Sequence, residues 1–290
     1  MNLIEASLKS AGLVICLAFI IFPGDFLILQ YTIFGLILFS IGIPHGAIDH
    51  LISNPKIDKR GFLRFLITYL LLISVYIVFW YLFPLLALLA FLLMSAYHFG
   101  QTHFIQSNQK ARLSWLIFLS RGGYFLVVIL LGDLQETQSI LSSLINLDFL
   151  NQVRFWIPGL FLAFTVLVQL IWGPKFSSSD WLELLFLGPI LFFSPLLVSF
   201  VVYFGFWHAF PSMRREYDYL KNFKPYSSPK KFIFQLLPFS GISLLGISLI
   251  LIFGLNFLQS NELIFLFFVM ISVISFPHIL YMDQFLKKKT

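Results

Sequence analysis

The chain has 290 residues, of which 59% are hydrophobic and only 11% are charged. This composition excludes a soluble globular domain, in which about a quarter of the residues are charged. The net charge of +6 could suit nucleic acid, but in a membrane protein the distribution of Lys and Arg matters more than their sum, so we expect no nucleic-acid partner. Cys16 is the only cysteine, which excludes an internal disulfide and a site built from several thiolates.

Apolar segments of about 20 residues recur along the chain, and this is the length that a helix needs to cross the hydrocarbon core. Strands could cross only as a closed barrel of alternating segments, and no such alternation is present. We therefore predict an all-α, polytopic membrane protein in contact with membrane lipid, with residues 1–290 forming a single integral membrane domain. Eight to ten spans are compatible with the sequence. The ten that fit best are 3–22, 26–43, 62–83, 85–103, 113–131, 153–172, 181–193, 195–210, 232–254 and 262–283.

Two features of these spans bear on how they pack. The seventh and eighth spans are short, and they could instead be the two halves of a re-entrant hairpin buried in protein. Either choice returns the chain to the same side of the membrane. The spans show no small-xxx-small ladder, the pattern typical of closely packed membrane helices.

The basic residues indicate the orientation. With ten spans, Lys and Arg fall near the two chain ends, in the loops after even-numbered spans or, as Arg64 and Arg121 do, within the span that follows such a loop, and Arg154 alone lies in an opposite loop or its adjoining span end. The opposite loops carry acidic residues such as Asp25 and Glu262. Because basic residues remain on the cytoplasmic side, we predict a multi-pass protein of the cell membrane with both termini in the cytoplasm.

The histidines lie at the predicted cytoplasmic ends of even-numbered spans. A single histidine near a span end is more often an interfacial residue, but six scattered histidines would divide between both faces and the loops. Neutral imidazole binds iron, copper, zinc or nickel, so the pattern predicts a nitrogen-rich site for a divalent transition metal. The histidines are His45 and His50 in span two, His98 and His103 in span four, His208 in span eight and His278 in span ten.

Two carboxylates could orient ligand rings from behind. Asp49 follows His45 by four residues, so it lies on the same face if that segment is helical, and its carboxylate could accept a hydrogen bond from a ligand ring. Asp283, five residues after His278, could do the same elsewhere.

The pairs His45/His50 and His98/His103 are each separated by five residues, or about 140° around an ideal helix. Both members of a pair would not normally bind one ion unless the backbone bends between them. We therefore expect His50 and His103 to be the weakest ligand candidates. Residues that permit a bend do lie beside the pairs, at Pro44, Gly46 and Gly100.

The histidines lie in four short motifs, which are Ile43–His50 (IPHGAIDH), Tyr97–Gly100 (YHFG), Trp207-His208, and Pro277–Leu280 (PHIL) with Asp283. These motifs, in order from about position 42 to position 283, resemble those of the Brp/Blh family of membrane-bound β-carotene 15,15'-dioxygenases. The resemblance implies a carotenoid substrate, Fe(2+), O2 and cleavage of the central double bond to give retinal, together with a functional link to a retinal-binding rhodopsin.

The resemblance implies that His45, His98 and His208 are iron ligands and that no catalytic residue is needed beyond the ligands. Where the family often has a further histidine, four residues after the one that matches His208, this chain has Ser212. We predict that His278 takes the fourth place, because its Pro-His motif is itself a feature of the family.

His50 or His103 could fill the fourth place instead, and His103 stands where an acidic residue is expected. These departures could mean an altered iron geometry, a different carotenoid or lost activity, as in a relative that binds retinal or aids rhodopsin assembly.

Another membrane iron oxygenase is the alternative enzyme, but the HxxxH and HxxHH boxes of such families are absent from the sequence. A transporter would need ionisable residues near the bilayer midplane, and here they gather at one end of the spans.

Overall fold

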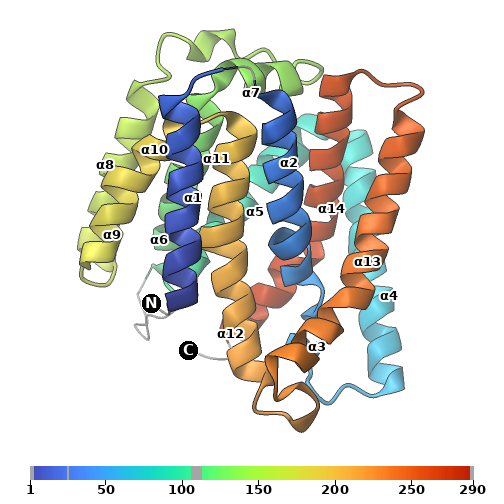
Figure 1. The fold of residues 1–290 in the computed structure, drawn as a ribbon. Helices are drawn as coiled ribbons and strands as arrows, with labels where there is room; N and C mark the ends of the chain where they lie inside the picture. The colour runs from blue at the N-terminus through green and yellow to red at the C-terminus, as the bar shows by residue number, and fades with distance from the viewer. Residues whose placement is uncertain (1–2, 25, 106–112, 288–290) are drawn as a thin grey trace. The chain divides into compact units, whose positions relative to one another are not determined.

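The computed structural model describes residues 3–24, 26–105 and 113–287 (Figure 1). Helices account for most of these residues, and no strand is present within these ranges. The predicted all-α class is therefore confirmed. The α-helices are α1 (Leu3–Ile21), α2 (Leu27–Ile37), α3 (Asp49–Ser53), α4 (Lys59–Leu82), α5 (Pro84–His103), α6 (Ser114–Gly132), α7 (Leu134–Leu141), α8 (Trp156–Trp172), α9 (Ser178–Leu182), α10 (Gly188–Phe192), α11 (Leu196–Val202), α12 (Phe210–Leu220), α13 (Pro229–Gly254) and α14 (Ser260–Lys287).

Short segments with other hydrogen-bonding patterns interrupt or join these helices. The π-helical segments are η1 (Leu38–Gly42), η4 (Glu183–Leu187) and η5 (Tyr203–Ala209). The 3₁₀ segments are η2 (Pro44–Gly46), η3 (Asp148–Leu150) and η6 (Lys224–Tyr226).

Each of the ten predicted spans corresponds to helical structure. Within the described ranges, eight continuous helical stretches are long and apolar enough to cross a membrane. The chain is thus a polytopic helical membrane protein. The stretch Leu196–Leu220 has 25 residues, which is enough to cross alone and disfavours the re-entrant alternative for this segment. The remaining two predicted spans are shorter: α8 has 17 residues, and the seventh is divided into α9, η4 and α10.

Local sequence explains where several helices begin. The Asp58 carboxylate accepts a hydrogen bond from the Gly61 backbone N–H (2.8 Å) and so caps α4. Ser177 and Asp180 form a reciprocal capping box at α9. Proline stands at the first position of α5 and α13, where its missing N–H costs nothing.

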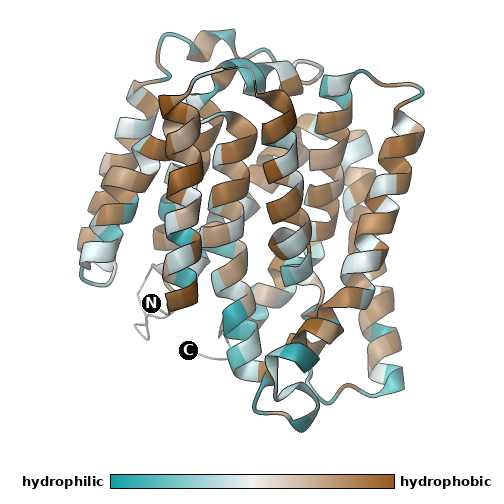
Figure 2. Ribbon diagram, in the orientation of Figure 1, coloured by the Kyte–Doolittle hydropathy of each residue, from teal (hydrophilic) through white to brown (hydrophobic). Residues whose placement is uncertain are grey.

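The surfaces of the helices are strongly apolar. On α4, for example, Ile67, Leu71 and Val78 each expose more than half of their surface. Figure 2 shows brown, hydrophobic residues along the helices, with teal residues mostly in the connecting segments and near helix ends. Such exposed apolar faces are expected where lipid, not water, surrounds the protein.

Contacts within the chain define two compact units, each made of two separate stretches. The first unit comprises residues 1–42 and 95–211, and the second comprises residues 43–94 and 212–290. The chain changes unit at three places, and these lie two or three residues from His45, His98 and His208. A single integral membrane domain stays our prediction.

In the first unit, α6 packs against α8 and α10, α2 packs against α11, and α1 packs against α11 and η5. Helices α5 and α6 approach so closely that a Cβ added at Gly100 would lie 1.8 Å from the Phe118 carbonyl oxygen. A Cβ at Gly122 would lie 1.9 Å from the Ala96 carbonyl oxygen. Ala96 and Gly100 are four residues apart, so a single small-xxx-small pair permits this close contact, although the span has no longer ladder of such residues.

Two π-helical segments of the first unit, η1 and η5, contact each other. A Cβ at Gly42 would lie 2.7 Å from Phe204, and one at Gly205 would lie 2.3 Å from Ile37. Small residues therefore permit this contact. Because π-helical turns are rare and frequently occur at functional sites, their position just before His45 and around His208 is informative.

In the second unit, α14 packs against α3, α4 and α13. The indole N–H of Trp80 donates to the Ser272 hydroxyl (2.8 Å), which joins α4 to α14 in the apolar interior. Helix α14 thus forms the shared packing surface of this unit and carries His278 into it.

Candidate metal centre

The first unit brings together two of the predicted ligands. His98 on α5 and His208 in η5 expose only 3% and 1% of their surfaces, and their ring centroids lie 4.5 Å apart. The rings of Phe99 and Phe204 pack on His208 at 4.6 and 5.6 Å. The two imidazoles are therefore held edge to face in apolar surroundings.

The nitrogen Nδ1 of each of these rings has a polar partner on α5. The Nδ1 atom of His98 lies 3.3 Å from the Gln101 side-chain oxygen, and that of His208 lies 2.8 Å from the Thr102 hydroxyl. An amide oxygen can only accept, so His98 carries its proton on Nδ1. In a neutral imidazole this places the lone pair on Nε2, which becomes the nitrogen that can bind a metal.

The second unit contains a similar pair. His45 in η2 and His278 on α14 are buried, with ring centroids 4.6 Å apart. The Nδ1 atom of His278 lies 2.8 Å from the Asp49 carboxylate, whose other oxygen accepts a hydrogen bond from the Tyr69 hydroxyl (3.0 Å). The carboxylate accepts from Nδ1–H, which leaves the lone pair of His278 on Nε2.

Asp49 thus holds a different ring from the one that its spacing suggested. The expectation that it serves His45 depended on a continuous helix, but the chain forms the 3₁₀ segment η2 and then a turn before α3 begins at Asp49. Gly46 permits the approach of the other histidine, because a Cβ there would lie 3.3 Å from Nδ1 of His278.

The remaining candidates have surroundings of their own. His50 packs against the rings of Phe62, Phe65 and Phe239 at 5.5, 5.9 and 5.0 Å. The Asp283 carboxylate forms an exposed ion pair with Lys287 (2.6 Å) on the last turn of α14.

His103 is engaged at both ring nitrogens. Its Nδ1 atom lies 2.7 Å from the Glu183 carboxylate, and its Nε2 atom lies 3.0 Å from the Tyr203 hydroxyl. Ser212, which stands where the resemblance led us to expect a further histidine, is buried in α12.

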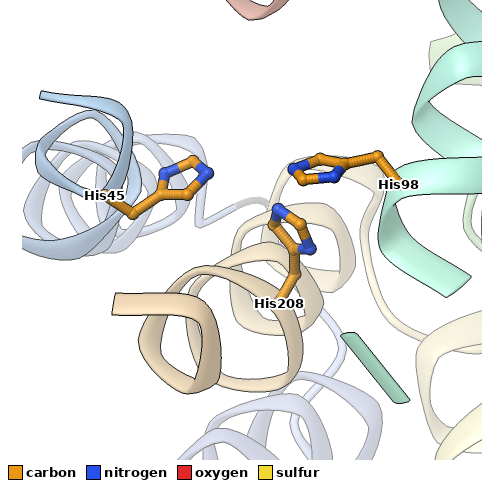
Figure 3. A group of neighbouring side chains, drawn as sticks. All are labelled: His45, His98 and His208. Atoms are coloured by element: carbon orange, nitrogen blue, oxygen red, sulfur yellow. The ribbon is translucent and has the colours of Figure 1, made fainter. Parts of the chain in front are cut away.

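Three of the histidines make up a buried group that could hold a metal ion: His45, His98 and His208 (Figure 3). Each offers one imidazole nitrogen, and Figure 3 shows the rings of His98 and His208 pointing toward each other. Three neutral nitrogen donors suit a divalent transition metal, whereas magnesium and calcium prefer oxygen.

Sequence reasoning missed Gln101 and Thr102 as partners of the histidines. Both are buried polar residues, and they follow His98 by three and four residues, so they share its side of α5. The sequence signal that could have identified them is the presence of two polar side chains beside a histidine at the end of an apolar span.

Comparison with known proteins finds a family match over most of the chain. A family model described as "Beta-carotene 15,15'-dioxygenase" matches residues 36–285, which include every histidine. The chain is 28% identical over 268 residues to the "Beta-carotene 15,15'-dioxygenase" of uncultured marine bacterium 66A03, covering 89% of this chain and 94% of the relative.

A second relative is the "Probable beta-carotene 15,15'-dioxygenase Blh" of Halobacterium salinarum, which is 28% identical over 198 residues. That alignment covers 58% of this chain and 56% of the relative. No solved structure matches the chain.

Proposed function

Because the chain belongs to the beta-carotene 15,15'-dioxygenase family, we propose that it cleaves β-carotene or a related carotenoid at the central double bond with O2 to give retinal. The observation that carries this proposal is the family match over residues 36–285, which contain the buried group His45, His98 and His208. A membrane location supports it, because a carotenoid is dissolved in the bilayer.

We propose that Fe(2+) is bound by His45, His98 and His208, with His278 in the fourth place. Iron bound there would supply the redox chemistry that the use of O2 requires. The hydrogen bonds at Nδ1 of His98, His208 and His278 support this set, because they favour Nε2 as the ligand atom.

Two histidines are less suited to the fourth place. Both ring nitrogens of His103 already have hydrogen-bond partners, and His50 lies among three phenyl rings. Asp49 supports the choice of His278, because a carboxylate behind a ligand ring raises its basicity.

The residues around the ligands would provide the apolar environment for the substrate. A polyene hydrocarbon has no polar group for the protein to bind, so its binding energy must come from burial of apolar surface. Phe99 and Phe204 pack on His208 and keep water from that ring. Phe204 also stacks on Phe200 (5.6 Å, 10° between the ring planes), which extends the aromatic surface along the helix.

The test is expression in cells that accumulate β-carotene, followed by chromatography of the pigments. We expect the wild type to consume β-carotene and form retinal, and His45→Ala, His98→Ala and His208→Ala to leave it intact. Thr165→Val is the matched control, because Thr165 is buried in the same unit as His98 and its hydroxyl donates to the Ser120 carbonyl.

Two results would contradict the proposal. Shorter or longer apocarotenals in place of retinal would show cleavage away from the central bond. Intact β-carotene with folded, iron-loaded wild-type protein would show that this chain does not cleave it, and retinal binding in support of a rhodopsin would then become the candidate role.

A further inference from the structure

One threonine contacts both histidines of the first unit. Thr102 lies one turn after His98 on α5, and its hydroxyl oxygen is 3.5 Å from the backbone carbonyl oxygen of His98. The same oxygen is 2.8 Å from Nδ1 of His208, a residue 106 positions away in the sequence. The Thr102 side chain is buried, with 6% of the residue exposed.

A hydroxyl can donate one hydrogen bond and accept another at the same time. Thr102 can therefore donate to the His98 carbonyl, which only accepts, while it accepts from Nδ1–H of His208. In this arrangement the lone pair of His208 lies on Nε2.

We propose that Thr102 is a positioning residue that selects the tautomer and the ring orientation of His208 for metal binding. This inference rests on the proposed metal centre. Through Thr102 the ring of His208 is tied to the backbone turn that carries His98. Outer partners of this kind orient metal ligands and raise their basicity.

Thr102 also lies at the boundary between His208 and a polar cavity in the first unit. The cavity has a volume of about 340 Å³, and its lining includes Thr102, Lys9, His103, Asp180, Glu183 and Trp207. Among its charged groups, Glu183 bonds to Lys9 and His103, and Asp180 bonds to Arg121. Thr102 thus lines this cavity and also contacts His208.

The test compares cobalt binding by purified full-length protein in detergent, with Co(2+) as the spectroscopic probe. The variants are Thr102→Val, which keeps the shape and removes the hydroxyl, and Thr102→Ser, which restores the hydroxyl. We expect Thr102→Val to weaken cobalt affinity by about 10- to 100-fold, as removal of such outer partners does, and to shift the visible bands of bound cobalt. Thr102→Ser should return both properties toward the wild type.

Two controls separate this role from a general loss of stability. Thr165→Val removes another buried hydroxyl of the first unit and should leave the cobalt spectrum unchanged. Unfolding of the metal-free proteins should begin at similar temperatures for Thr102→Val and Thr165→Val.

Wild-type cobalt affinity and spectrum in folded Thr102→Val would overturn the role of Thr102 while leaving the metal centre in place. A wild-type protein that binds no cobalt and no iron would overturn the proposed metal centre itself, and this role with it. The two failures are therefore distinguishable.

Discussion

At the scale of single residues, Asp49 is the carboxylate with the most direct contact to a proposed ligand. It is 2% exposed and accepts hydrogen bonds from His278 and Tyr69. A buried acceptor with two donors fixes the orientation of both, and the contact with His278 joins residues 229 positions apart.

Replacing Asp49 with alanine should reduce both stability and metal content. The change leaves buried donors on His278 and Tyr69 without their acceptor, which costs about 1–3 kcal/mol of unfolding free energy for each group. Thermal unfolding in detergent and iron per protein molecule are the measurements. Asp283→Ala is the matched control, because its partner Lys287 is largely exposed and such pairs contribute about 0–1 kcal/mol. Equal behaviour of the two variants would contradict the role of Asp49.

Gly122→Ala should destabilise the first unit far more than Gly123→Ala. The added methyl group at Gly122 would collide with the Ala96 carbonyl oxygen at 1.9 Å, whereas at Gly123 its nearest neighbour would be 3.6 Å away. Overpacking costs about 1–3 kcal/mol, and backbone atoms cannot rotate aside as a side chain can. Unfolding midpoints of the two variants in the same detergent give the comparison. A Gly122→Ala protein as stable as Gly123→Ala would show that α5 and α6 are less closely packed.

Single residues also show how far sequence reasoning extends. The positions of the histidines at span ends identified His98 and His208 as members of one site, and the structure places them in contact. The partners Gln101 and Thr102 were missed because the sequence places them beside His98 but does not show that the His208 ring packs against the same side of α5. Asp49 was predicted to accept from a candidate ligand ring, but its spacing pointed to His45 and not to His278, because spacing reports local neighbours and not contacts over 229 positions.

At the scale of elements, α1 is joined to the rest of the first unit by a partly buried ion pair. The ammonium group of Lys9 lies 3.4 Å from Glu5 on its own helix and 3.4 Å from Glu183 in η4. The side chains of Lys9 and Glu183 are 17% and 14% exposed. Helix α1 precedes the residues matched by the family model.

Lys9→Met should weaken the attachment of α1 by about 1–3 kcal/mol, because the partly buried Glu183 carboxylate loses one of its two partners and keeps His103. Glu183→Gln should lower stability less in the Lys9→Met protein than in the wild type, since the effects of substitutions at contacting residues are not additive. The double-mutant cycle is measured by thermal unfolding, with Lys221→Met, at an exposed pair with Asp218, as the control. Strict additivity of Lys9→Met and Glu183→Gln would show that the pair contributes nothing.

Element boundaries were predicted well where hydropathy changes abruptly. The fifth span, predicted at 113–131, is helix α6 at Ser114–Gly132. The eighth was predicted to end at 210, yet the helix continues to Leu220. The sequence of α12 becomes polar and includes Pro211, so hydropathy marks the membrane boundary there and not the end of the helix. The π-helical turns leave no signal in composition, because they alter the hydrogen-bond register and not the residue types.

At the scale of the whole molecule, orientation in the membrane is the property that the basic residues predict. An even number of spans would place both termini on one side, and the concentration of Lys and Arg predicts that this side is the cytoplasm. The division of the chain into two interleaved units was not predicted, because uniformly apolar spans give no signal for which helices pair.

Fusion reporters in a bacterial host would test this orientation. Green fluorescent protein fused after Thr290 should fluoresce, and alkaline phosphatase at the same point should be inactive, because it folds only outside the cytoplasm. Phosphatase inserted at Asn256, between α13 and α14, should be active instead. An active C-terminal phosphatase would contradict the predicted topology.

The π-helical segment Tyr203–Ala209 has a consequence for how the chain can vary among its relatives. A π-helical turn holds one residue more than the regular turn it replaces. Deletion of a single residue there, such as Gly205, would let the helix bond regularly, but it would rotate everything on one side of the deletion by about 100° relative to the other. His208 could not then keep both its contact with His98 and the present direction of α12. Substitutions within this segment change packing locally, whereas a change in its length reorients a proposed ligand. The number of residues from Tyr203 to Ala209 is thus the quantity that we expect natural selection to preserve.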